Sequence, residues 1–123
     1  GMYSDHTIFQ IIGQLLIAFL FVATGIINST TKFRQHLDRM VAVGVPLAKA
    51  ALILGFILQI AGGLMLASDF HRSIGAAMLI VFTIVATGIF HQFWRVEDPL
   101  RRHLHVSFIF SNTALVGALL MLM

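Results

Sequence analysis

The sequence TIFQIIGQLLIAFLFVATGIIN, residues 7–28, is a nearly continuous apolar run with no charged residue and no proline. On a helix, its polar side chains and several neighbours fall within about 60° of one line along the surface. Asn28 follows Gln10 by 18 positions, which is about 27 Å at 1.5 Å per residue and close to the ~30 Å hydrocarbon core of a bilayer. The run therefore predicts a membrane-spanning helix with a narrow hydrogen-bonding face turned toward protein. That face comprises Gln10, Gln14, Ile17, Phe21, Thr24, Gly25 and Asn28.

The composition of the 123-residue chain is that of a membrane protein with one domain. Hydrophobic residues make up 59% and charged residues 11%, and mean hydropathy is +0.94, whereas a soluble domain carries about 25% charged residues. The lack of cysteine excludes disulfides, thiolate metal sites and CXXC redox chemistry by this chain. The net charge of +3 does not indicate nucleic-acid binding, because the basic residues sit at the ends of apolar segments.

Four apolar segments predict an all-α fold, an integral membrane four-helix bundle with spans at about 7–29, 46–67, 73–93 and 104–123. Pro46 suits the first turn of the second span, and Pro99 is expected to end any helix in the loop before the fourth. Residues 30–45 are compatible with a short helix at the membrane interface. A soluble bundle of amphipathic helices is excluded, because spans two to four show no continuous charged face.

The second span has a face of small residues that predicts close helix packing in lipid. It reads Ala48, Leu52, Gly55, Gln59, Gly62, Gly63 and Leu66.

The basic residues fall on one side of this topology. Seven of the eight lie at the ends joined by residues 30–45 and 94–103, and only Arg72 lies at the other. Positive residues favour the cytoplasmic side. We therefore expect a multi-pass protein of the inner (plasma) membrane, with basic loops cytoplasmic and both termini periplasmic or extracellular.

Buried amides are the first candidates for function: Gln14, Asn28, Gln59 and Asn112. Polar groups in lipid are costly unless paired, so these amides either form hydrogen bonds between helices or line a small-molecule pocket. No acidic residue lies inside any span, which argues against a proton-coupled antiporter.

Histidines and aromatic residues near the basic side are the second group of candidates. His36, His91, His103 and His105 could converge, but His103 and His105 point apart on a helix and no carboxylate stands at a useful offset, so we expect no metal site. Phe93 and Trp94 are either an aromatic anchor at the headgroup level or a stacking wall beside a ligand.

Several motifs, in order, resemble the DoxX family of small four-helix membrane proteins. They are QLLIAFLFVATG at 14–25, QIAGG at 59–63, HQFW at 91–94 and NTALVG at 112–117. The resemblance implies redox work at the membrane, since relatives include a subunit of thiosulfate:quinone oxidoreductase. The family commonly carries Arg where this chain has Gln14 and Glu where it has Gln59. It also commonly carries a lysine near the position of Asn28. All three charges are replaced by neutral amides here, which weakens any inherited acid–base role.

Three functions follow as hypotheses. The first is binding of a quinone-like apolar ligand, or service as a small subunit of a membrane oxidoreductase with a membrane or soluble partner. The candidate ligand-binding residues are Gln14, Asn28, Gln59, His91, Trp94 and Asn112, with the pocket near the cytoplasmic ends of the spans. The second is a non-catalytic structural or assembly subunit, and homo-oligomers are compatible with either. The third, a small-solute transporter, is disfavoured by the lack of a buried carboxylate.

Overall fold

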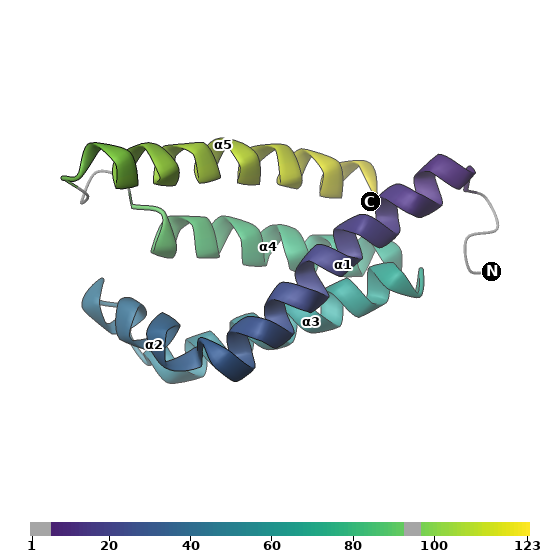
Figure 1. Cartoon of the computed structure of the whole chain (residues 1–123). Helices are drawn as coiled ribbons and strands as arrows, with labels where there is room; N and C mark the ends of the chain where they lie inside the picture. The colour runs from purple at the N-terminus through teal and green to yellow at the C-terminus, as the bar shows by residue number, and fades with distance from the viewer. Residues whose placement is uncertain (1–5, 93–96) are drawn as a thin grey trace.

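The structure is a computed structural model that describes residues 6–92 and 97–123. Its helices are α1 (Ile8–Thr31), α2 (Phe33–Ala42), α3 (Ala48–Ala67), α4 (Arg72–Phe90) and α5 (Pro99–Met121) (Figure 1). Four of these described helices, α1, α3, α4 and α5, are long and apolar enough to cross a membrane. The described residues contain no strand. The all-α membrane fold predicted from the sequence is confirmed, with α2 as a short additional helix between the first two spans.

The helix starts explain two differences from the predicted spans. Pro99 begins α5 instead of ending a helix, because the Asp98 side chain caps it by accepting a hydrogen bond from the Leu100 backbone N–H at 3.2 Å. The last helix therefore starts at Pro99, before the span predicted from 104. The span predicted from 46 starts at Ala48, because Leu47 adopts the left-handed conformation with φ of +50°.

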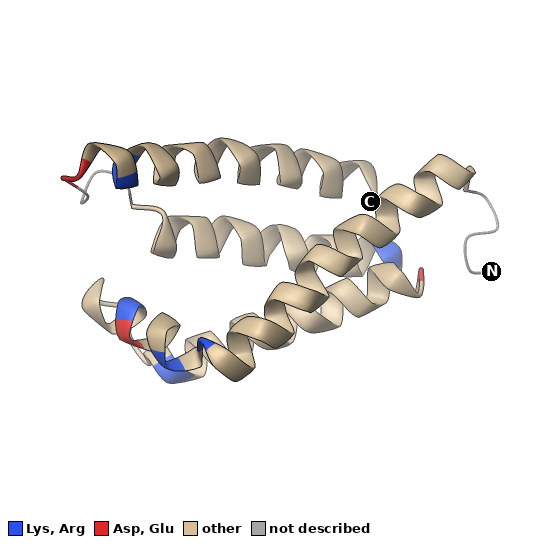
Figure 2. Cartoon of the chain, in the orientation of Figure 1, with Lys and Arg blue, Asp and Glu red and all other residues tan. Residues whose placement is uncertain are grey.

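The helices pair in chain order across an open bundle. In Figure 1, α1 crosses α3 obliquely, α3 lies against α4, and α4 runs beside α5. Most of the Lys and Arg residues lie at the end of the bundle that holds α2 and the start of α5 (Figure 2). Arg72, the first residue of α4, lies at the opposite end. We call these the basic end and the turn end; the turn end holds the α3–α4 turn, the start of α1 and the end of α5.

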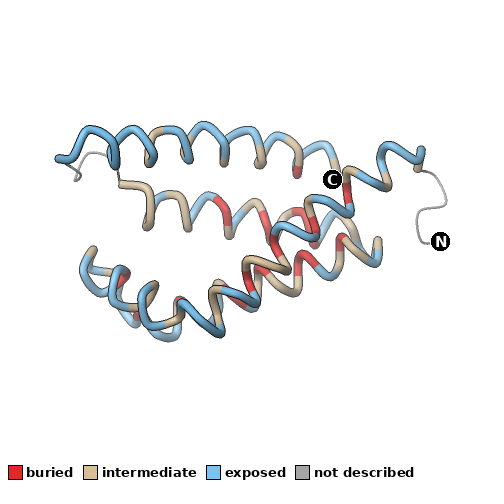
Figure 3. Tube along the Cα trace, in the orientation of Figure 1, coloured by how far each residue is buried: buried red, intermediate tan, exposed pale blue. Residues whose placement is uncertain are grey.

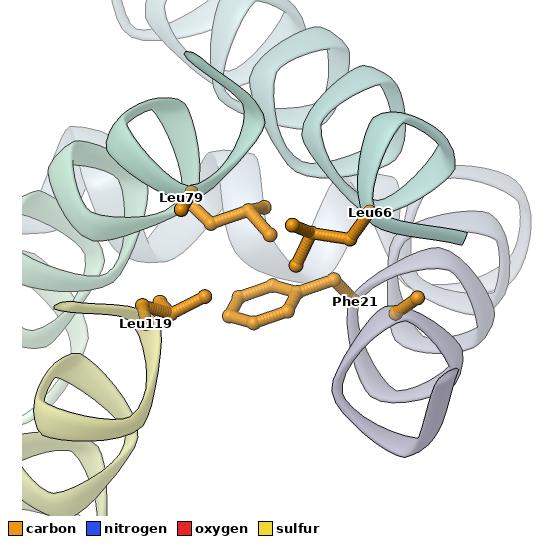
Figure 4. Close-up of a cluster of buried hydrophobic side chains, with 6 residues drawn as sticks. Phe21, Leu66, Leu79 and Leu119 are labelled. Carbon is orange, nitrogen blue, oxygen red and sulfur yellow. The ribbon is translucent and has the colours of Figure 1, made fainter. Parts of the chain in front are cut away.

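The tightest packing lies toward the turn end. Phe21, Leu66, Leu79 and Leu119 come from four different helices and converge on one another (Figure 4). Glycines bring α3 against its neighbours: a Cβ on Gly62 would meet the Gly75 carbonyl oxygen of α4 at 3.1 Å, and one on Gly63 would meet the Val22 side chain of α1 at 2.7 Å. The small-residue face of the second span therefore packs as the sequence predicted.

The outer surface is apolar, as contact with lipid requires. Buried positions lie on the inward faces of α1, α3 and α4, whereas α5 is exposed along most of its length (Figure 3). Large side chains such as Phe9, Phe19 and Phe110 are 83%, 71% and 71% exposed. A water-soluble protein rarely exposes so much contiguous apolar surface.

Candidate functional site

A cavity of about 530 Å³ lies between α1, α2, α3 and α4 in the half of the bundle nearer the basic end. Its size is within the range of small-molecule sites, about 300–1,000 Å³. Apolar and aromatic side chains form most of the wall, among them Met40, Leu52, Phe56, Phe82, Ile89 and Phe90. The polar lining consists of Thr24, Asn28, His36, Arg39, Gln59 and His91.

The Gln59 amide ties the wall of this cavity to α1. Its Nε2 donates to the Phe21 carbonyl oxygen at 3.0 Å and to the Thr24 hydroxyl at 2.7 Å. Gln59 is 4% exposed, and the nearby Gly25 leaves room for it, because a Cβ there would lie 3.3 Å from the Gln59 side chain. Gln59 is therefore both an interhelical clamp and part of the cavity lining.

The Asn28 side chain lines the same cavity without such a tie. It is half-buried on α1 and has no hydrogen bond to any side chain or backbone group within residues 6–92 and 97–123. An amide carries both donors and an acceptor. Asn28 can therefore engage a ligand without breaking an existing contact.

Helix α2 brings a histidine and a cation to the cavity. It is anchored by Met40, which is buried against Leu52 and Phe56 of α3, and this anchor places His36 and Arg39 in the lining. His36 Nδ1 lies 2.8 Å from the Lys32 carbonyl oxygen. Because a carbonyl only accepts, Nδ1 carries the proton, and Nε2 of the neutral ring is a hydrogen-bond acceptor.

His91 closes the cavity next to α5. It lies just beyond the last residue of α4, and its Nδ1 is 3.1 Å from Nδ1 of His105 on α5. Its ring also stacks on Phe108 at a centroid distance of 5.0 Å. Burial, with smaller contributions from His105 and the Arg39 cation, lowers the pKa of His91 below its ordinary value. The lowered pKa favours the neutral ring, in which one nitrogen donates and the other accepts.

Three of the six predicted ligand-binding residues, Asn28, Gln59 and His91, thus share one cavity. Gln14 lies at the turn end, where it lines a different cavity. Asn112 donates to the Thr87 hydroxyl at 2.9 Å between α5 and α4 and is not in the cavity lining. Trp94 lies outside the described residues.

The sequence model of the DoxX family matches residues 9–92. The chain belongs to the DoxX family. No curated protein and no solved structure matches it. The matched region holds α1 to α4 and all of the described cavity lining, whereas α5 and the NTALVG motif at 112–117 lie beyond it.

The structure also adds two residues to the candidate ligand site: Arg39, and His36, which the sequence suggested only as a possible metal ligand. His36 and Arg39 line the cavity because α2 packs against α3. Leu37 and Met40 form the apolar face of α2 in this contact. The signal was available as spacing: Phe33, Leu37 and Met40 recur at intervals of four and three within a polar segment. The His91–His105 contact depends on how α5 packs on α4, which no local pattern specifies.

Among residues 6–92 and 97–123, no three His, Asp or Glu side chains come together in a way that could hold a metal ion. The His91–His105 pair supplies two nitrogens, fewer than structural or catalytic zinc sites use.

Proposed function

We propose that this DoxX-family membrane protein binds a quinone-like ligand in the cavity of its basic half. The observation that carries the proposal is the division of the lining: aromatic and aliphatic side chains form the walls, and a few polar groups stand at separate points among them. A quinone has the matching form, a flat apolar ring with two polar oxygens and an apolar tail. Most small-molecule sites combine apolar walls with a few orienting polar groups in this way.

The polar groups suit both redox forms of such a ring. A quinone oxygen accepts hydrogen bonds, and the Arg39 guanidinium and the Asn28 amide can donate them. A hydroquinone hydroxyl donates, and His36 Nε2 is an acceptor because its Nδ1 proton faces the Lys32 carbonyl. A site that holds both forms suits a carrier or docking subunit of a redox system, and we assign the electron source to a partner oxidoreductase.

The orientation in the inner membrane forms part of the proposal. The basic end would face the cytoplasm, because Lys and Arg concentrate in cytoplasmic loops. The natural chain has no cysteine, so Gln35→Cys and Ser68→Cys provide single labelling sites at the two ends. Modification of Ser68→Cys in intact cells by a membrane-impermeant maleimide, with Gln35→Cys protected, is the expected result. The reverse labelling pattern would contradict this orientation.

A matched pair of variants tests ligand binding. Short-chain ubiquinone and menaquinone analogues are titrated into purified protein, with fluorescence of Trp94, the single tryptophan, as the readout. Asn28→Leu should weaken binding about tenfold, as expected for one lost hydrogen bond of about 1.4 kcal/mol. Asn112→Leu makes the same chemical change outside the cavity and should leave the affinity unchanged. Absence of saturable quenching in the natural chain, or equal effects of both variants, would contradict the proposal.

An assembly role is the second candidate, and the exposure of α5 favours it. Among the described helices, the backbone of α5 lies close to that of α4 only. Leu119 is the one residue of α5 that is buried. A partner helix could cover the remaining surface. Retention of one partner in stoichiometric amount through purification, and its loss in a Phe110→Ala variant on the exposed face, would support assembly over ligand binding.

A further inference from the structure

A second cavity, of about 590 Å³, lies at the turn end, away from the proposed quinone site. Its lining comes from the first half of α1, the α3–α4 turn, the first residue of α4 and the end of α5. Its lining includes Gln10, Gln14, Ile17, Asp69, Arg72 and Met121. Unlike the first cavity, which has the Arg39 guanidinium but no carboxylate, it contains both a carboxylate and a guanidinium.

The Gln14 amide leaves one buried oxygen unpaired at this cavity. Gln14 is 1% exposed, and its Nε2 donates to the Leu66 carbonyl oxygen at 2.8 Å and to Asp69 Oδ1 at 3.0 Å. Both partners only accept, so the amide cannot be flipped. Its Oε1 has no hydrogen-bond partner within the described part of the chain. A buried acceptor of this kind calls for a donor that the described residues do not supply.

Arg72 gives the cavity a complementary donor end. Its Nε donates to the Leu122 carbonyl oxygen at 2.7 Å, and its Nη1 contacts His6 Nε2 and lies 4.0 Å from Asp69 Oδ1. A guanidinium has five N–H donors, and these contacts leave others available. The side chain remains 35% exposed. An acceptor end at Gln14 and Asp69 therefore stands beside a donor end at Arg72.

We propose that this cavity binds the headgroup of an aminophospholipid. The primary ammonium donates to Gln14 Oε1 and is balanced by the Asp69 carboxylate, while the phosphate accepts hydrogen bonds from Arg72. The apolar lining residues Ile17, Ala118 and Met121 flank the polar groups, and an acyl chain can lie along them between α1 and α5. A zwitterion suits this site because a single cation or anion would oppose either Arg72 or Asp69.

A headgroup methylation series tests the proposal on the unmodified protein. Phosphatidylethanolamine, its N-methyl and N,N-dimethyl derivatives, and phosphatidylcholine, all with the same acyl chains, compete for the protein in mixed micelles. Bound lipid is counted by native mass spectrometry. Retention should persist while one N–H remains and fall about tenfold at the last methylation, which removes the only donor for Gln14. Equal retention of all four lipids would overturn the proposal.

Two buried amides provide the matched variants. Gln14→Met should bring the retention ratio of ethanolamine to choline lipid close to one, whereas Gln59→Met, at the other cavity, should leave the ratio unchanged. An equal loss of the ratio in both variants would overturn the assignment to the turn end. Should Gln14→Met fail to fold, the methylation series on the natural chain still decides. Displacement of the lipid by soluble phosphoethanolamine at millimolar concentration would overturn the lipid assignment in favour of a free zwitterion.

The lipid site and the quinone site fail independently. A protein that binds quinones without lipid preference would refute only the former, and one that selects aminophospholipids without binding quinones would refute only the latter.

Discussion

The helices of this bundle pack more closely around Phe21 than toward the basic end. At the turn end, Leu66, Leu79 and Leu119 are fully buried and meet Phe21, and glycines let the helix backbones touch (Figure 4). Toward the basic end, α1 and α3 diverge from the α4–α5 pair (Figure 1), and a cavity of about 530 Å³ fills part of the space. Close packing around Phe21 thus holds together helices that enclose a hollow toward the basic end, and the turn-end cavity of about 590 Å³ lies beside this packed cluster.

Removal of the Phe21 ring from the closely packed cluster should have the largest effect on stability. Phe21→Ala deletes a side chain that is 3% exposed and contacts residues from several helices. Because the surrounding helices cannot collapse into the space, the free energy of unfolding should fall by about 3–5 kcal/mol. Reversible unfolding in mixed micelles, followed by circular dichroism, measures the change.

Two other phenylalanines serve as controls for Phe21. Phe19→Ala, on the outer face of the same helix at 71% exposure, should change stability by less than about 0.5 kcal/mol. Phe56→Ala should cost less than Phe21→Ala, because Phe56 already borders the basic-end cavity and is 8% exposed. Equal losses at Phe21 and Phe56 would show that the two ends are packed alike.

The glycine contacts should give the next largest effect. A methyl group on Gly62 would meet the Leu79 side chain at 2.9 Å and the Gly75 carbonyl oxygen at 3.1 Å. The side chain can shift but the backbone cannot without parting α3 from α4, so Gly62→Ala should destabilise the protein by about 1–3 kcal/mol. Gly88→Ala, with nothing within 4 Å of the added carbon, should be neutral or stabilise by about 1 kcal/mol. A neutral Gly62→Ala in the same unfolding assay would refute the close approach.

The sequence predicted the closely packed part of the bundle better than the more open basic end. Helical periodicity placed Gln14, Phe21 and Gly25 on the inner face of α1, where they are buried. Spacing of small residues likewise identified Gly62 and Gly63 as contacts. These features repeat along a helix, so a local pattern carries them. Family motifs led to the DoxX assignment by the same route.

The candidate site was predictable only in part, because it depends on contacts between distant segments. Asn28, Gln59 and His91 belong to three separate segments, and no local sequence pattern predicts that they line the same cavity. Gln14 lies on the same face of α1 as Asn28 but lines the other cavity. One helix face runs the full thickness of the membrane, so residues aligned along it serve both ends. Arg39 entered the lining through the fold of α2, which depends on the burial of Met40 against α3.

His91 should give the smallest effect, a pH dependence of stability that arises at the basic end. Its pKa is lowered from 6.5 in the folded protein by burial, then by His105 and Arg39. The unfolded chain therefore binds a proton more readily than the folded one as the pH falls. The stability contributed by the neutral ring is complete above pH 6.5 and is lost as the pH falls through the folded-state pKa. The melting temperature should accordingly be lower at pH 5 than at pH 7.5.

Comparison with His91→Gln separates this contribution from those of the other histidines. The variant should show a flatter melting profile between pH 7.5 and pH 5, whereas His71→Gln, at an exposed position of the α3–α4 turn, should follow the natural chain. Because His91 remains partly open to solvent, the difference should amount to a few degrees at most. A His91→Gln profile as steep as that of the natural chain would place the acid sensitivity in another group.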